Sequence, residues 1–292
     1  MSAVALHFAS GAAFFSGAAM LIAGLLLLVT CGPRKVLPAI GRMLLLGGIF
    51  CLVMSATPLP VWAWCVWAAF FAIWCVCLAS RKSSQKLRTA ATAAAAICTI
   101  AAAGWELSYH LPPRAVPGKW NRLVVIGDSL SAVDFTEGGD PWPTLLARDT
   151  GIDVVNLAFS GAKAGSAERR LSGDDLAGAL VLLEIGGNDI LGATSASEFE
   201  ASLERLLRKI CRDDNAVLML ELPLPPLYNR FGEIQRRLAG RHGVVLIPKR
   251  YFASVLLGSD STIDSLHLSP TGHRKMSDLI ASLVLPALAT DD

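Results

Sequence analysis

Acidic side chains are almost absent from the first 120 residues of this 292-residue chain, where Glu106 is the only one beside nine lysines and arginines. The remaining residues hold 23 acidic and 17 basic side chains, so the net charge of +2 conceals a basic first part and a mildly acidic second part. The basic residues of the second part are scattered among acids. This distribution excludes the continuous basic surface that is typical of nucleic-acid binding.

Cysteine is scarce in the second part, which contains only Cys211, whereas the first part contains the other six. One cysteine cannot form a disulfide within its own domain, and no cysteine–histidine spacing typical of a metal site is present. Cysteines in apolar helices usually pack as small hydrophobic side chains. We therefore expect neither a disulfide framework nor a bound metal.

Long apolar runs fill the first part and raise the mean hydropathy of the chain to +0.50. The run 3–30 contains one ionisable side chain, His7, and exceeds the ~20 residues that span a bilayer. It is also longer than the ~7–15 apolar residues of a signal peptide, and no lysine or arginine precedes Arg34, which favours a membrane helix over a cleaved signal. We predict a transmembrane region at residues 1–110, with four helices at about 3–30, 37–57, 61–80 and 89–109.

The fourth segment is rich in alanine and is the weakest of the set, and a surface helix that does not span remains its alternative. Ionisable residues inside membrane segments normally mark transport pathways. Here His7, Arg42 and Glu106 lie near the ends of the predicted helices. We therefore interpret the bundle as an anchor and not as a transporter.

Loop charges predict the orientation of this anchor. The loops after the first and third segments are basic, whereas the amino terminus and the loop 55–60 carry no lysine or arginine. Basic loops face the cytoplasm, so four spans place the amino terminus and the second part outside it. A proline-rich linker is expected at residues 111–120, because its prolines cannot continue a helix.

The second part opens with a short apolar run, Leu123 to Ile126, followed directly by Gly127-Asp128-Ser129-Leu130. An apolar run that ends at a turn signal is typical of a buried parallel strand. Glycine permits a sharp turn there, which would present Ser129 at the carboxyl edge of the sheet, where open α/β sheets bind ligands. Ser129 is thus a candidate nucleophile, although the tetrapeptide alone also fits a plain strand-to-helix turn.

Apolar strands alternate with periodic helices through the second part, which predicts a parallel sheet covered on both faces. Strands expected at 153–158 and 180–185 lead to Gly161 and Asn188 at the same sheet edge as Ser129. The backbone N–H groups of Ser129 and Gly161 and the Asn188 amide can donate to an oxygen that becomes negative when an ester is attacked. Taken singly, Gly161 and Asn188 also fit ordinary turn positions.

A general base for Ser129 must come from the histidines of the second part, His242, His267 and His273. His242 precedes a strand and is expected to be a solvated turn residue, and His273 lies in the first turn of the last helix, where a structural role is expected. His267 follows Asp264 by three residues in one loop. That spacing lets a carboxylate orient an imidazole, whose other nitrogen can accept the proton of a serine.

These segments resemble, in residues and in order, the four blocks of the SGNH (GDSL) hydrolase family. The resemblance covers about residues 121–288, and the segments 129–146 and 154–161 are most similar to the bacterial thioesterase I/lysophospholipase L1 group of arylesterases. It implies a flavodoxin-like three-layer α/β/α fold for 121–288. It also implies a Ser129, His267 and Asp264 triad and an oxyanion hole formed by Ser129, Gly161 and Asn188.

Two features depart from that group. Ala162-Lys163-Ala164 follows Gly161 where the group commonly has aspartate and threonine, so its substrate specificity is not carried over. A four-helix anchor is not part of the usual family pattern.

The resemblance therefore implies a serine ester hydrolase that requires no metal or organic cofactor. We expect it in a bacterial cell membrane, with its catalytic domain outside the cytoplasm. Small-molecule, lipid or acylated envelope-glycan esters are the expected substrates, and no nucleic-acid or protein partner is indicated. One alternative is an O-acyltransferase in which a sugar hydroxyl replaces water. Another is a membrane bundle that carries a non-catalytic hydrolase-like domain.

Overall fold

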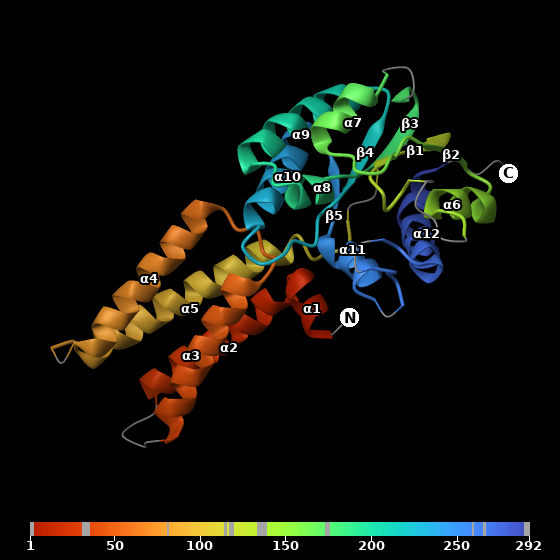
Figure 1. Ribbon diagram of the computed structural model, residues 1–292. Helices are drawn as coiled ribbons and strands as arrows, with labels where there is room; N and C mark the ends of the chain where they lie inside the picture. The colour runs from red at the N-terminus through yellow and green to blue at the C-terminus, as the bar shows by residue number, and fades with distance from the viewer. Residues whose placement is uncertain are drawn as a thin grey trace. The chain divides into compact units, whose positions relative to one another are not determined.

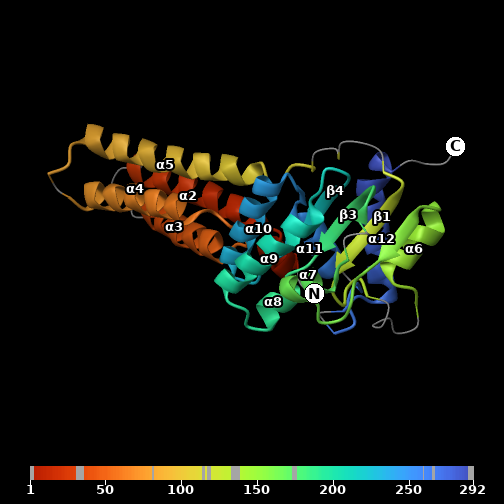
Figure 2. The same cartoon turned by 90° about the horizontal axis from the view of Figure 1, so that it is seen from above.

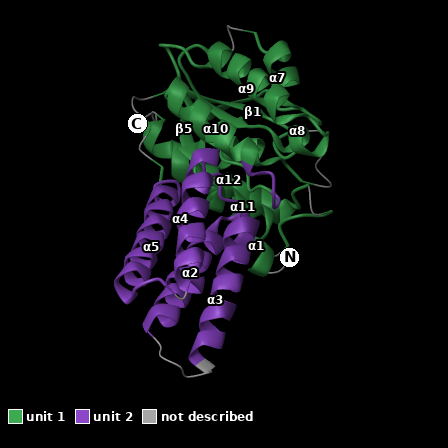
Figure 3. Ribbon diagram, turned by 90° about the vertical axis from the view of Figure 1, so that its left-hand side faces the viewer, with its two compact units in different colours: residues 1–6, 112–224, 230–292 green, residues 7–111, 225–229 purple. Residues whose placement is uncertain are grey.

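The computed structural model describes residues 3–30, 36–80, 82–113, 116, 120–132, 139–172, 176–258, 260–264 and 267–288. The chain divides into two compact units (Figure 3). The helical unit comprises His7–Leu111 with Pro225–Asn229, and the α/β unit comprises Met1–Leu6, Pro112–Leu224 and Arg230–Asp292. Residues 114–115 and 117–119 of the predicted linker lie outside the described residues.

The first 107 residues form the helices α1 (Ala3–Ala9), α2 (Ala12–Thr30), α3 (Val36–Met54), α4 (Val61–Ala79) and α5 (Gln85–Leu107). The stretch 3–30, predicted as one helix, is therefore divided in two. Gly11 adopts a φ of 84°, which ends α1, and the Ser10 hydroxyl accepts a hydrogen bond from the Ala12 N–H at 3.3 Å. A left-handed residue cannot continue a right-handed helix, so the chain starts a new one.

Among the described residues, the four helices α2 to α5 are long and apolar enough to cross a membrane. They run side by side within the helical unit (Figure 2). Helix α5 has the lowest hydropathy of the four but is also the longest, at 23 residues. The predicted set of four apolar helices is thus confirmed. Their insertion in a membrane is inferred from their length and composition.

Helices α2 and α3 approach each other through glycines. A Cβ at Gly17 would lie 2.7 Å from the Gly48 carbonyl oxygen, and one at Gly24 would lie 2.8 Å from that of Gly41. No side chain fits in such a space, so the two backbones pack directly against each other. Close backbone approach through small residues is the usual way in which helices associate in membranes, where the hydrophobic effect does not drive them together.

The α/β unit is built on a five-stranded, fully parallel sheet with the strand order β2-β1-β3-β4-β5. Its strands are β1 (Arg122–Gly127), β2 (Asp153–Asn156), β3 (Ala179–Glu184), β4 (Ala216–Leu220) and β5 (Val245–Ile247). Every residue of β3 is buried, which explains why that strand is apolar on both faces. The predicted parallel α/β fold is confirmed.

Helices cover both faces of this sheet (Figure 1). Helices α7 (Ala164–Arg170), α9 (Ala196–Ile210) and α10 (Asn229–His242) lie on one face, and α6 (Trp142–Thr150), α11 (Lys249–Leu256) and α12 (Pro270–Val284) lie on the other. The short helix α8 (Gly187–Leu191) follows β3 directly. Helices α7, α8 and α11 were not predicted, because each is too short for its apolar period to be recognised.

Candidate active site

Three neighbouring strands carry the predicted site residues at their carboxyl ends. Ser129 follows β1, Gly161 follows β2, and Asn188 lies in the first turn of α8, directly after β3. Strand β1 lies between β2 and β3, so the three segments meet at one edge of the sheet. The Phe159 N–H donates to the Gly127 carbonyl at 3.3 Å and joins the first two segments. The structure therefore places these residues at the edge where the sequence located them.

Gly127 is required for a reason other than the predicted sharp turn. It is the last residue of β1, and its φ is not in the left-handed region. A Cβ at this position would lie 2.8 Å from Glu184 Oε2 and 2.9 Å from Ser131 Oγ. Glycine thus makes room for a buried carboxyl group beside the strand. The turn itself begins one residue later, where the Asp128 carbonyl accepts from the Ser131 N–H at 3.1 Å.

Gly161, in contrast, is required by its backbone conformation. Its φ is 74°, a region that side chains disfavour, and no described atom lies within 4 Å of the position that a Cβ would occupy. The residue is exposed. The backbone at Gly161 is therefore open to an approaching ligand, which an oxyanion donor requires.

Asp264 holds His267 at two points. Asp264 Oδ2 lies 2.7 Å from His267 Nδ1, and Asp264 Oδ1 accepts from the His267 N–H at 2.8 Å. The loop is closed by a hydrogen bond from the Ile263 N–H to the His267 carbonyl at 2.9 Å. Ser265 and Leu266, between the two residues, lie outside the described residues. A carboxylate on Nδ1 places a proton there and leaves Nε2 as the basic nitrogen.

The Asp264–His267 loop lies close enough to the end of β1 for His267 to influence Asp128 electrostatically. Burial raises the pKa of Asp128 to about 6, while a hydrogen bond from the Leu130 N–H and the charge of His267 act in the opposite direction. Since Asp128 is adjacent to Ser129, the imidazole belongs to the electrostatic surroundings of the predicted nucleophile. The structure thus brings the loop of His267 to the edge formed by β1, β2 and β3.

A buried carboxyl group, Glu184, forms hydrogen bonds with the turn that carries Ser129. Glu184 Oε2 accepts from the Asp128 N–H at 3.2 Å and from the Ser131 hydroxyl at 3.1 Å, and the Trp142 indole donates to Ser131 Oγ at 3.1 Å. Burial, together with the nearby charge of Asp128, raises the pKa of Glu184 well above its usual value. The neutral form of Glu184 is therefore favoured at this position.

The side chains of Asp128 and Asn188 are also in direct contact, a pairing that the sequence motifs do not predict. Asn188 Nδ2 donates to Asp128 Oδ2 at 3.0 Å. The sequence does indicate that Asp128 and Asn188 both lie shortly after strand ends. Their contact can be predicted only with the strand register, in which Gly127 pairs with Glu184.

Lys163, at the position that departs from the related group, joins two segments of the site. Its Nζ donates to Thr194 Oγ1 at 3.2 Å and to the Gly192 carbonyl at 3.4 Å. Beside it, the Ala164 N–H donates to Asp189 Oδ2 at 3.0 Å. Three hydrogen bonds therefore attach the segment after Gly161 to the segment that contains Asn188.

The other two histidines are engaged elsewhere. His273 is buried, its Nδ1 accepts from the Trp142 N–H at 3.3 Å, and burial lowers its pKa, in keeping with a structural role. His242 is not the solvated turn residue that the sequence suggested. It lies in the last turn of α10, only 15% of its side chain is exposed, and its Nε2 lies 3.2 Å from Glu204 Oε1. No group of three potential ligands among the described residues is arranged to hold a metal ion.

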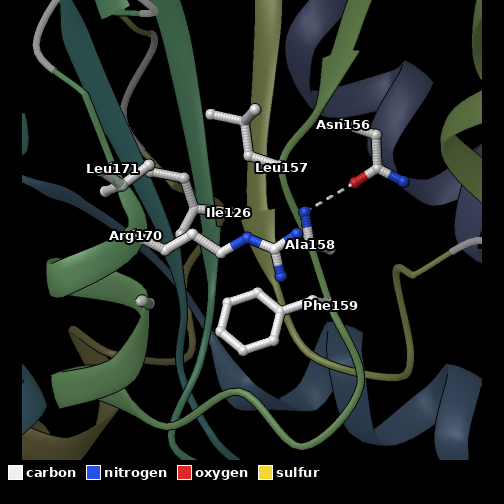
Figure 4. A pocket seen from close by; sticks show the side chains of 8 residues that line it. Ile126, Asn156, Leu157, Ala158, Phe159, Arg170 and Leu171 are labelled. Carbon is white, nitrogen blue, oxygen red and sulfur yellow. Dashed lines mark hydrogen bonds between the residues drawn. The ribbon is translucent and has the colours of Figure 1, made fainter.

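A small cavity of about 160 Å³ opens at the carboxyl end of β2, beside the segment that leads to Gly161 (Figure 4). Both polar and apolar atoms line it, and the Arg170 guanidinium lies over the Phe159 ring, 4.5 Å from its centroid. The residues that line it are Ile126, Asn156, Leu157, Ala158, Phe159, Ala167, Arg170 and Leu171.

The α/β unit is similar in sequence and in fold to known proteins. Residues 125–275 match the GDSL-like Lipase/Acylhydrolase family. Esterase TesA of Pseudomonas aeruginosa is 30% identical over 138 residues, which cover 43% of this chain and 69% of that protein. An arylesterase of Vibrio mimicus is 28% identical over 174 residues, 55% of this chain and 86% of the relative. A crystal structure of TesA superimposes with a TM-score of 0.50 at 26% identity, covering 57% of this chain and 99% of the other.

Proposed function

Because this chain belongs to the GDSL-like lipase/acylhydrolase family of ester hydrolases, we propose that Ser129 is its nucleophile, His267 its general base and Asp264 the residue that orients His267. The observation that carries the proposal is the double contact of Asp264 with His267, at 2.7 and 2.8 Å. It fixes both the ring and the tautomer that a base toward Ser129 requires.

The first half of the reaction forms an acyl-enzyme. Ser129 Oγ attacks the ester carbonyl carbon while His267 Nε2 accepts the hydroxyl proton. Negative charge develops on the carbonyl oxygen, where the N–H groups of Ser129 and Gly161 and the Asn188 amide stabilise it. The bond to the alcohol oxygen then breaks, and His267 returns the proton to the departing alcohol.

The second half releases the acid. Water attacks the acyl carbon of the Ser129 ester, and His267 accepts one of its protons. The tetrahedral intermediate collapses with cleavage of the bond to Ser129 Oγ, and His267 reprotonates the serine. The overall reaction is the hydrolysis of one ester bond to an acid and an alcohol, with the side chains returned to their starting state.

The substrate class proposed here follows from the anchor. Helices α2 to α5 would hold the enzyme in a membrane, and the basic loops 31–35 and 80–84 would lie in the cytoplasm. An even number of spans then places Ser129 outside the cytoplasm. An enzyme held there would face membrane lipids and envelope glycans, so we propose lipid esters and acylated envelope glycans as substrates.

A transferase that uses the same triad is the second candidate. Its first half-reaction would be identical, and a sugar hydroxyl would replace water in the second. The segment Ala162-Lys163-Ala164 departs from the related esterases directly after Gly161, so their acyl acceptor is not carried over to this chain.

Active-site labelling tests the assignment in the full-length protein. A fluorophosphonate probe is expected to label the wild type and to leave Ser129→Ala unlabelled, whereas Ser131→Ala keeps its label. Labelling of Ser129→Ala would overturn the nucleophile assignment. A lack of labelling in the folded wild type would support the non-catalytic alternative.

A panel of p-nitrophenyl esters of increasing acyl length then defines the substrate, assayed with and without an added sugar acceptor. Hydrolysis that does not respond to the acceptor supports the hydrolase. Transfer of the acyl group to the sugar in preference to water would favour the transferase.

A further inference from the structure

Asp128 and Asn188 form a buried contact at the centre of the site. Asp128 is 3% exposed, and its two carboxylate oxygens have different partners. Oδ1 accepts from the Leu130 N–H at 3.0 Å, and Oδ2 accepts from Asn188 Nδ2 at 3.0 Å. One oxygen thus contacts the turn that carries Ser129, and the other contacts the segment after β3.

We propose that Asp128 is a positioning residue, which sets the orientation of the Asn188 amide so that an N–H and not the C=O faces the substrate carbonyl oxygen. The inference rests on the proposed function of Asn188 as an oxyanion donor. It adds the reason why that amide has the required direction.

The chemistry of the two groups explains why the Asn188 amide adopts one of its two possible orientations. A side-chain amide has a donor side and an acceptor side of almost the same shape, and either side can face a neutral neighbour. An ionised carboxylate only accepts, so the amide must present an N–H to Asp128. The NH2 group carries a second N–H, which diverges from the first. That second N–H is the donor proposed for the oxyanion.

Glu184 keeps Asp128 in place. It accepts from the Asp128 backbone N–H at 3.2 Å and lies on the neighbouring strand, in register with Gly127. The two carboxyl groups are side by side, an arrangement that is stable when one of them is neutral. Burial raises the pKa of Glu184 well above its usual value, whereas the N–H groups of Leu130 and Asn188 donate to the Asp128 carboxylate and favour its charged form, so we assign the proton to Glu184.

Asp128→Asn is the informative variant because it keeps the shape of the side chain. The Leu130 N–H requires an oxygen at the Oδ1 position, so the new amide must direct its NH2 group toward Asn188. Two donors would then face each other, and Asn188 must turn its C=O toward position 128. We expect kcat to fall by about 10²-fold with a small change in KM, as for the loss of an oxyanion donor.

A double-mutant cycle in the full-length protein separates this role from a structural one. Asn188→Ala alone is expected to lower kcat by about 10²–10³-fold. If Asp128 acts through Asn188, the double variant Asp128→Asn/Asn188→Ala will be no slower than Asn188→Ala. Asp153→Asn, which removes an exposed carboxylate at the opposite end of the sheet, is the control for lost charge and is expected to leave kcat unchanged.

Glu184→Gln is the variant of the neighbouring carboxyl group that corresponds to Asp128→Asn, and it tests whether Glu184 carries the proton. Glutamine reproduces a neutral Glu184, with an oxygen for the Asp128 N–H and an NH2 group beside the Asp128 carboxylate. Its kcat is expected to stay within about threefold of the wild type. A loss as large as that of Asp128→Asn would contradict the assignment of the proton to Glu184.

The outcomes are distinguishable. If Asn188→Ala retains its kcat, the proposed oxyanion hole fails, and with it the basis of this inference. If Asn188→Ala is impaired but Asp128→Asn is not, or if the two losses multiply, the oxyanion hole stands and the positioning role of Asp128 is refuted.

Discussion

The indole N–H of Trp74 donates to the Thr92 hydroxyl at 3.0 Å, and both side chains are buried between α4 and α5. Trp67 and Thr99 repeat the contact at 3.1 Å, seven residues away along each helix. This spacing places both pairs on one face of two antiparallel helices. The alanine-rich α5, the least hydrophobic of the four, therefore has specific polar partners on α4.

Replacement of Thr92 by valine removes the acceptor and leaves the buried Trp74 N–H without its partner. Hydrogen bonds between helices in membranes contribute about 0.6 kcal/mol on average, up to about 1.7. We expect a loss of about 1 kcal/mol, and about twice that for Thr92→Val/Thr99→Val. Unfolding by SDS, followed by tryptophan fluorescence, measures it. Thr89→Val is the control, because the exposed Thr89 hydroxyl bonds only to the Gln85 carbonyl of its own helix. Equal losses for Thr89→Val and Thr92→Val would contradict the contact.

Removal of the proposed base or of its orienting carboxylate is expected to abolish most of the activity. His267→Ala and Asp264→Asn should each reduce kcat by about 10⁴-fold, because members of a triad act as a unit. The double variant should be little worse than His267→Ala. Steady-state hydrolysis of a p-nitrophenyl ester measures this effect, with circular dichroism to verify the fold. Substantial turnover by folded His267→Ala would exclude His267 as the base.

Lys163 is expected to act on turnover through the segment that contains Asn188. Lys163→Met removes the donors to Thr194 Oγ1 and the Gly192 carbonyl. We expect the ordered conformation of that segment to lose about 1 kcal/mol of stabilisation. This corresponds to a three- to tenfold lower kcat at nearly constant KM. Thr194→Val should give a smaller loss that is not additive with Lys163→Met. A change confined to KM would instead assign Lys163 to substrate binding.

The stability of the α/β unit should depend on pH through Glu184. Its pKa is raised well above 4.5 in the folded state, because the charged form is buried. The folded protein therefore binds a proton that the unfolded chain releases, and the resulting stabilisation is complete below pH 4.5 and is lost as the pH rises. Glu184→Gln has no proton to lose. Its Tm should match that of the wild type near pH 4 and exceed it increasingly toward pH 8. A difference in Tm that does not change with pH would refute the raised pKa.

The proposed orientation in the membrane can be tested by cysteine accessibility. In a background without the native cysteines, Ser83→Cys, between α4 and α5, is expected to resist a membrane-impermeant thiol reagent in intact cells. Asn121→Cys, at an exposed position before β1, is expected to react. Permeabilised cells provide the control, since both positions should then be labelled. Reversed labelling would place Ser129 in the cytoplasm and point to intracellular esters or thioesters as substrates.

Much of this protein was determined by local sequence. Four apolar runs separated by short loops predict four long helices, because the hydrophobic length that spans a bilayer is a property of a single segment. Apolar strands alternating with periodic helices predict the parallel α/β fold. Local sequence also suggests the candidate residues Ser129, Gly161, Asn188 and the pair Asp264–His267, because each lies shortly after a strand or in one short loop.

Only the tertiary structure decided how these segments support one another. Glu184 lies against Gly127 because β3 pairs with β1 across 56 residues of intervening chain, and no local pattern encodes that register. The same pairing brings Asp128 to Asn188 and explains why glycine is required at 127 without a left-handed backbone. Likewise, the contacts of Trp67 and Trp74 with Thr99 and Thr92 depend on how two helices are rotated about their axes. Such contacts arise from packing between segments that are distant in the sequence, so composition and periodicity cannot predict them.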